Sequence, residues 1–135
     1  MFARKIKMLQ KRILLVDDEE NILDTYCSLL SEKGFYVVTS DSVRKARKEF
    51  FRSQFDLVIT DLGMREDNGF TLVEEIKKKS PNTPVIMLTG SVKTKMLSEY
   101  LSILGVYAMI EKTCSDKDFI SCVMSSLGLR YDLKL

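Results

Sequence analysis

The sequence of 135 residues contains no histidine and only three cysteines. Without histidine, the chain cannot form a histidine-dependent catalytic triad or a histidine-ligated metal centre. The cysteines, Cys27, Cys114 and Cys122, have neither a CxxC arrangement nor the spacing of metal ligands. We expect them to be small buried hydrophobic residues in a reducing cytoplasm. Any metal must then be bound through oxygen, which favours Mg²⁺, Ca²⁺ or Mn²⁺.

Long apolar runs and a strong charge imbalance are also missing. No run is long enough for a transmembrane helix, and the basic segment 1–11 lacks the apolar centre of a signal peptide, so the sequence predicts a cytoplasmic protein. The net charge of +2 is too small to indicate a nucleic-acid or membrane partner. The length fits a basic N-terminal arm at 1–11, one domain at 12–128 and a short tail at 129–135.

Five short apolar runs alternate with five segments of helical periodicity. The runs lie at 12–16, 35–40, 57–59, 84–88 and 106–110. The helical patterns follow at about 20–33 and then from residues 43, 70, 92 and 119. Gly34 is expected to end the first helix, and Asp41 or Ser42 to cap the second. This alternation predicts a parallel sheet with helices on both faces, and five strands fit the flavodoxin-like doubly wound (βα)5 sandwich, an α/β fold with strand order 2-1-3-4-5.

Polar side chains follow four of the predicted strands: Asp17 and Asp18 the first, Asp61 the third, Thr89 the fourth and Lys112 the fifth. In the predicted order they all face one crevice beyond the carboxyl ends of the strands. Taken singly, each is ordinarily a helix cap, a turn residue or a surface lysine. Two unit charges 4 Å apart repel by about 4 kcal/mol at an effective dielectric near 20, so three carboxylates together favour a hard divalent cation. Mg²⁺ binds carboxylates and shares phosphate oxygens, and an aspartate can act as a nucleophile toward phosphorus.

These motifs together resemble those of one family. The matching pieces are ILLVDDE at 13–19, DLVITDLGM at 56–64, NG at 68–69, PVIMLTG at 84–90, Gly105 and Lys112. They are similar to the receiver domain of two-component (phosphorelay) response regulators, over about residues 12–128. The resemblance implies transfer of a phosphoryl group from the phosphohistidine of a sensor histidine kinase or histidine phosphotransfer protein to an aspartate, which switches partner binding. A chain without histidine cannot itself be that donor.

The resemblance also implies a role for each matching residue. Asp61 is the expected phosphoacceptor, Lys112 is expected to contact the phosphoryl group, and Thr89 to move toward it and report its presence. The expected Mg²⁺ ligands are Asp18, Asp61, the Gly63 carbonyl and, through water, Asp17.

Three positions depart from the family pattern. Arg65 and Thr113 stand where receivers often have prolines, so a cis peptide after the strand-five lysine is not expected, because a non-proline cis bond costs about 2.5–4 kcal/mol. Met109 stands where the aromatic partner of the switch threonine usually is. Tyr107, two residues earlier, is predicted to point to the same face as Met109 by strand alternation.

Two other functions are weighed against the phosphoaccepting receiver. The departures raise the alternative of a degenerate receiver that acts as an unswitched protein-interaction module. A phosphatase acting through an aspartyl-phosphate is disfavoured, because Gly63 stands where such enzymes carry a second aspartate, so no enzymatic turnover of a separate metabolite is expected. The face formed by the predicted helix from residue 92, the predicted strand at 106–110 and the predicted helix from residue 119 is the candidate output surface and the candidate surface for homodimerisation. It includes Lys93, Lys95, Tyr100, Tyr107 and Met109.

Overall fold

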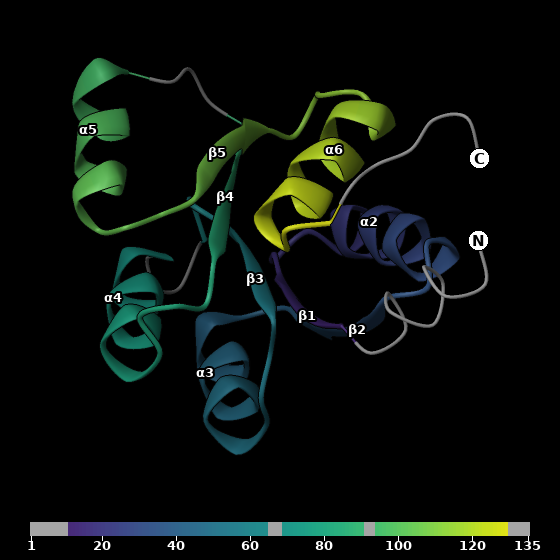
Figure 1. Ribbon diagram of the computed structural model, residues 1–135, viewed down its shortest axis with the longest axis horizontal. Helices are drawn as coiled ribbons and strands as arrows, with labels where there is room; N and C mark the ends of the chain where they lie inside the picture. Colours follow the sequence, from purple (N-terminus) through teal and green to yellow (C-terminus); the bar gives the residue numbers. More distant parts are fainter. Residues whose placement is uncertain (1–10, 65–68, 91–93, 130–135) are drawn as a thin grey trace.

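The computed structural model describes residues 11–64, 69–90 and 94–129 as five strands and five helices. The strands are β1 (Arg12–Val16), β2 (Tyr36–Ser40), β3 (Leu57–Asp61), β4 (Val85–Thr89) and β5 (Ala108–Glu111). The helices are α2 (Glu20–Glu32), α3 (Val43–Arg52), α4 (Gly69–Lys79), α5 (Lys95–Ile103) and α6 (Asp116–Ser126). All neighbouring strands are parallel, in the order β2-β1-β3-β4-β5 (Figure 1). The predicted fold and strand order are confirmed.

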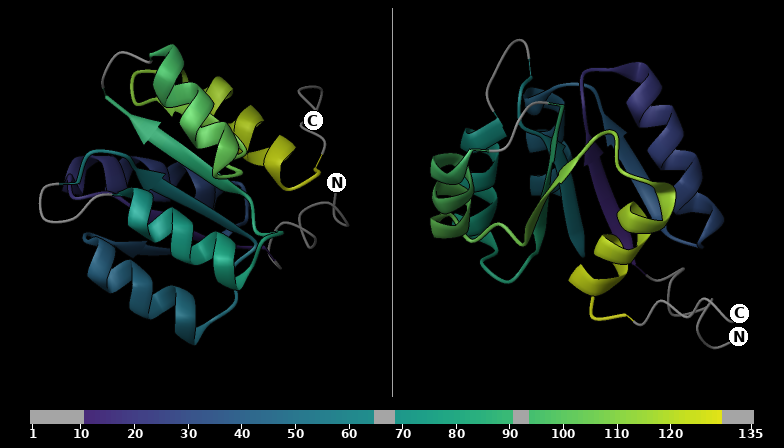
Figure 2. Two further views of the ribbon diagram at one scale, coloured as in Figure 1. Left: turned by 90° about the vertical axis from the view of Figure 1, so that its left-hand side faces the viewer. Right: turned by 90° about the horizontal axis from the view of Figure 1, so that it is seen from above.

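The sheet lies between two layers of helices, with α2 and α6 on one face and α3, α4 and α5 on the other (Figure 2). Each face has its own apolar core. Ile13 and Leu15 of β1 belong to the core under α2 and α6, whereas Leu14 and Val16 belong to the other. This division follows from the alternation of side chains along a strand. Because both faces are covered, β3 and β4 are buried along their whole length.

Most element ends lie close to their predicted positions. Ser42 caps α3, because its hydroxyl accepts a hydrogen bond from the Lys45 N–H at 3.1 Å. Gly34 follows α2 with a φ of 95°, as predicted for a residue that ends a helix. β5 begins later than predicted. The Val106 N–H still donates to the Leu101 carbonyl at 3.0 Å and therefore belongs to the termination of α5.

Two predictions about side-chain environment are wrong. Tyr107 does not share the surroundings of Met109. Met109 packs against the core under α3, α4 and α5, whereas the Tyr107 hydroxyl is hydrogen-bonded to Ser125 of α6. Tyr107 precedes β5, an edge strand, so its long side chain can reach the opposite layer. The three cysteines are half-buried rather than fully buried, because they pack at the margin of the core under α2 and α6.

Several predicted features lie outside the described residues: most of the N-terminal arm, Arg65, Lys93 and the tail beyond residue 129. The peptide bond after Lys112 is trans, as expected, and no cis bond occurs in the described ranges. Among the helices of those ranges, none is long and apolar enough to cross a bilayer.

Candidate functional site

The strand register brings the predicted site residues to one edge of the sheet. Asp17 directly follows β1, Asp61 and Thr89 are the last residues of β3 and β4, and Lys112 directly follows β5. The pairs Val16–Thr60, Asp61–Leu88 and Thr89–Glu111 lie side by side in neighbouring strands. The predicted convergence of these positions is therefore present in the fold.

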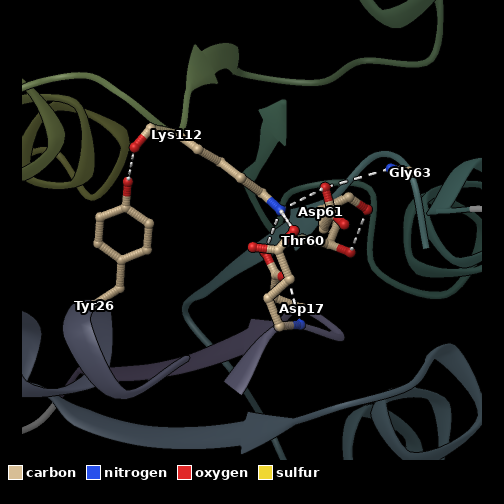
Figure 3. Close-up of polar contacts among 7 residues, drawn as sticks. Asp17, Tyr26, Thr60, Asp61, Gly63 and Lys112 are labelled. Carbon is tan, nitrogen blue, oxygen red and sulfur yellow. Dashed lines mark hydrogen bonds and ion pairs between the residues drawn. The ribbon is translucent and has the colours of Figure 1, made fainter. Parts of the chain in front are cut away.

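The centre of the site is an ion-pair cluster around Lys112 (Figure 3). Its Nζ lies 2.9 Å from Asp17 Oδ2, 3.3 Å from Asp61 Oδ1 and 3.7 Å from Glu19 Oε1. The side chains of Lys112, Asp17 and Asp61 are 11%, 0% and 6% exposed, so water screens these charges weakly. Burial by itself lowers the pKa of Lys112, but the Asp17 and Asp61 carboxylates outweigh it and raise the pKa. Lys112 is thus held as a cation beside two carboxylates.

The loop after β1 forms an acidic group of Asp17, Asp18 and Glu19, whose nearest oxygens all lie within 4.8 Å of one another. Asp17 Oδ1 accepts the Glu19 N–H at 2.8 Å and so folds the loop back on itself. Burial raises the pKa of Asp17, against the opposing effects of Lys112 and the Glu19 N–H. Asp17 Oδ2 is buried and accepts no well-directed hydrogen bond among the described residues, although Lys112 Nζ lies nearby.

Asp61 is positioned by its neighbours at the end of β3. Its Oδ1 accepts the Gly63 N–H at 3.3 Å, and its carbonyl accepts the Thr60 hydroxyl at 3.3 Å. Gly69, the first residue of α4, packs so close that an added Cβ would lie 2.6 Å from the Asp61 carbonyl oxygen. Sequence reasoning used Gly69 only as part of the family motif and missed this contact. The sequence feature that could have indicated this contact is a glycine at the start of a helical pattern, beside a buried strand end.

The backbone of Lys112 is held by two hydrogen bonds. Its N–H donates to the Thr89 carbonyl at 2.8 Å, and its carbonyl accepts the hydroxyl of Tyr26 from α2 at 3.0 Å. A Cβ added at Gly90 would lie 3.9 Å from the Lys112 side chain. Tyr26 lies in the helical pattern predicted at about 20–33, and no partner was predicted for its hydroxyl. The overlooked signal is that a buried tyrosine hydroxyl requires a partner.

This geometry fits a hard divalent cation. Three carboxylates gather in one loop, and Lys112 pairs both with Asp17 of this loop and with Asp61 of β3. Oxygen-only donors of this kind suit Mg²⁺. The site can therefore combine a metal, an ammonium group and an aspartate that is able to act as a nucleophile.

The candidate output surface carries exposed apolar side chains. Met96 and Ile103 of α5 are 80% and 83% exposed. Tyr100 is 41% exposed, and its ring contacts the ring of Phe70 in α4. Tyr107, next to β5, is also exposed. These residues give α5 and the start of β5 an apolar surface.

Comparison with known proteins agrees with the fold and the site. Residues 13–124 match the response regulator receiver domain, and the chain belongs to this family. It is 37% identical over 108 residues to the transcriptional regulatory protein GlrR of Escherichia coli, covering 78% of this chain and 23% of that protein. It is 39% identical over 121 residues to the alginate biosynthesis transcriptional regulatory protein AlgB of Pseudomonas aeruginosa, covering 90% of this chain and 27% of that protein. The chain thus spans about a quarter of the length of these relatives.

Solved receiver domains have the same architecture. A CheY-like receiver domain from Methanospirillum hungatei superposes with a TM-score of 0.82 at 27% identity, covering 87% of this chain and 94% of that one. The beryllofluoride-activated NtrC4 receiver domain dimer superposes with a TM-score of 0.82 at 28% identity, covering 88% and 98%. The chain is therefore a receiver domain of a two-component response regulator, and receivers are signalling domains.

Proposed function

We propose that this receiver accepts a phosphoryl group on Asp61. The observation that carries the proposal is the placement of the Asp61 carboxylate 3.3 Å from Lys112 Nζ, at the strand edge that also holds the acidic loop. An aspartate in this setting has a cation beside the oxygens where negative charge gathers during phosphoryl transfer.

Mg²⁺ is the cofactor that the acidic loop fits. Asp18, Asp61 and the Gly63 carbonyl would hold it directly, with Asp17 acting through a bound water. Bound there, it would neutralise the carboxylates and the oxygens of the phosphoryl group. The carboxylate oxygens of Asp17, Asp18 and Glu19, which lie within 4.8 Å of one another, support this assignment.

The donor is the phosphohistidine of a sensor histidine kinase or histidine phosphotransfer protein. An Asp61 oxygen attacks phosphorus, the new O–P bond forms, and the N–P bond to histidine breaks, leaving its electron pair on the imidazole nitrogen. Lys112 binds the equatorial oxygens of the group in transfer. The Thr89 hydroxyl at the end of β4 then turns toward the phosphoryl group and reports its presence.

The output is a change in partner binding rather than turnover of a metabolite. Phosphorylation shifts an equilibrium between two conformations, which exposes different surfaces to a partner. The apolar surface on α5 and β5 is the proposed contact, either with an effector or with a second copy of the chain. We place the receiver at 12–128 of a cytoplasmic protein, flanked by the arm at 1–11 and the tail from 129, with no nucleic-acid or membrane contact by this domain.

Incubation with acetyl phosphate and Mg²⁺ tests the proposal. Intact-mass analysis is expected to show an added mass of about 80 Da, the mass of one phosphoryl group on a carboxylate. The adduct should map to Asp61. It should not form when a chelator is present during the incubation, and it should be absent from Asp61→Asn. Asp41→Asn is the matched control, because Asp41 is 57% exposed and pairs with Lys45 on the surface. A parent chain that gains no adduct would overturn the proposal.

The state of association tests the output surface. Light scattering is expected to show a larger assembly of the chain, or tighter binding of its partner, when beryllofluoride and Mg²⁺ are present than when they are absent. Replacing Ile103 by serine should remove this difference, because Ile103 is 83% exposed on α5. Partner binding that is identical with and without beryllofluoride would favour the unswitched interaction module.

A further inference from the structure

The Tyr26 hydroxyl contacts the backbone of Lys112, directly after β5. Tyr26 belongs to α2, the helix that begins just after the acidic loop. Its side chain is buried, and its ring stacks on Phe119 of α6 with 4.2 Å between ring centroids and 14° between planes. The ring is therefore fixed between two helices, and its hydroxyl points at the Lys112 carbonyl (Figure 3).

Lys112 needs such a contact because the strand ladder ends before it. β5 is an edge strand whose last residue is Glu111, so no further strand is available to bond the Lys112 carbonyl. On its amide side, Lys112 donates to the Thr89 carbonyl, and on its carbonyl side it accepts the Tyr26 hydroxyl. The hydroxyl is protonated at neutral pH and can donate, and burial raises the pKa of Tyr26 further, to about 12.

The position of the Lys112 backbone determines where its ammonium group lies. A lysine stem has four flexible carbons, so only a fixed backbone limits the volume that the ammonium samples. Here the ammonium lies 3.3 Å from the Asp61 carboxylate. We propose that Tyr26 is a positioning residue for phosphoryl transfer, holding the Lys112 backbone so that its ammonium meets the phosphoryl group on Asp61. This inference rests on the proposed function.

The substitution Tyr26→Phe tests the proposal, because it keeps the stacked ring and removes only the hydroxyl. The Tyr36→Phe variant is the matched control, since it also loses only a hydroxyl, from a side chain that is 54% exposed at the start of β2, at the opposite end of the strands from the site. Both variants and the parent are assayed as the full chain, with acetyl phosphate and Mg²⁺, under conditions where urea unfolding shows them to be folded. We measure the rate constant of phosphorylation and, separately, the affinity for Mg²⁺ by calorimetry.

We expect Tyr26→Phe to lower the rate constant about tenfold, less than the roughly hundredfold loss that a 1 Å misplacement can cause. Its Mg²⁺ affinity should stay within about twofold of the parent, because the acidic loop is untouched. Tyr36→Phe should match the parent in both the rate constant and the Mg²⁺ affinity. In a Lys112→Ala background the same hydroxyl deletion should have little further effect, because the two residues act as one unit.

Each result decides the question. A Tyr26→Phe rate equal to that of Tyr36→Phe overturns the inference while leaving the proposed function intact. A parallel loss of Mg²⁺ affinity overturns it as well, because the hydroxyl would then act through the acidic loop. A parent chain that is not phosphorylated instead removes the proposed function itself.

Discussion

Replacing Lys112 by methionine removes the cation of the site while keeping most of the apolar stem. In the parent chain, Lys112 Nζ lies 2.9 Å from Asp17 Oδ2 and 3.3 Å from Asp61 Oδ1. The variant leaves these two buried carboxylates facing each other without a counter-charge. We therefore expect the free energy of unfolding to fall when no divalent cation is present.

The magnitude follows from the distances and the burial. At an effective dielectric near 20, each contact contributes an attraction of about 5 kcal/mol. The cost of burying the charges offsets most of that attraction. Removing one partner alone is more damaging, because the carboxylates stay buried and unpaired, and such truncations cost about 3–5 kcal/mol. We expect the free energy of unfolding to fall by about 3 kcal/mol, near the lower end of this range. The reason is that Asp17 already has a raised pKa and can take up a proton.

Urea unfolding at neutral pH, with a chelator and then with excess Mg²⁺, measures this effect. Mg²⁺ should replace the missing charge, so the gap between the variant and the parent should narrow to about 1 kcal/mol. Mg²⁺ would then stabilise the variant by about 2 kcal/mol more than it stabilises the parent, which corresponds to roughly thirtyfold tighter Mg²⁺ binding by the variant.

Lys77→Met is the matched control. Lys77 is also partly buried, but its Nζ donates to the carbonyls of Thr83 and Pro81 at 2.7 and 3.4 Å rather than pairing with a carboxylate. Its stability loss should be the same with and without Mg²⁺. A Lys112→Met chain as stable as the parent in chelator, or a gap that Mg²⁺ does not narrow, would refute the electrostatic reasoning.

Three further predictions concern single contacts. The substitution Gly69→Ala should lower the free energy of unfolding by about 1–3 kcal/mol in urea, because its Cβ would lie 2.6 Å from the Asp61 carbonyl. The folded pKa of Tyr26, about 12, exceeds the ordinary 10.0, so stabilisation by its neutral form is complete below pH 10 and lost as pH rises toward 12. Unfolding in urea across that range should show a loss of up to about 3 kcal/mol in the free energy of unfolding of the parent, and this loss should be absent in Tyr26→Phe. The pair of Arg47 and Glu75 joins α3 to α4 through 2.7–3.0 Å contacts, but both are about a third exposed, so a double-mutant cycle should give only about 0.5–1 kcal/mol.

Local patterns were sufficient to predict the architecture. Continuous apolar runs predict buried strands, and each is followed by helical periodicity, so the alternation alone indicates a parallel sheet covered on both faces. The positions of Asp17, Asp61, Thr89 and Lys112 at strand ends follow from the same pattern, because the carboxyl ends of parallel strands lie at one edge. The structure brings these four positions to that edge, while their chemical roles stay predictions.

The sequence by itself determined which chemical groups stand at the strand ends, because strand and helix periods are local properties. Only the tertiary structure decided which partners hold those groups in place. The bond from Tyr26 to Lys112 joins residues 86 positions apart, and the approach of Gly69 to Asp61 depends on how α4 packs against β3. Tyr107 likewise bonds to α6 because it precedes an edge strand. Hydrophobic periodicity specifies the face on which a side chain lies, but not the polar atom that it meets there, so these contacts required the fold.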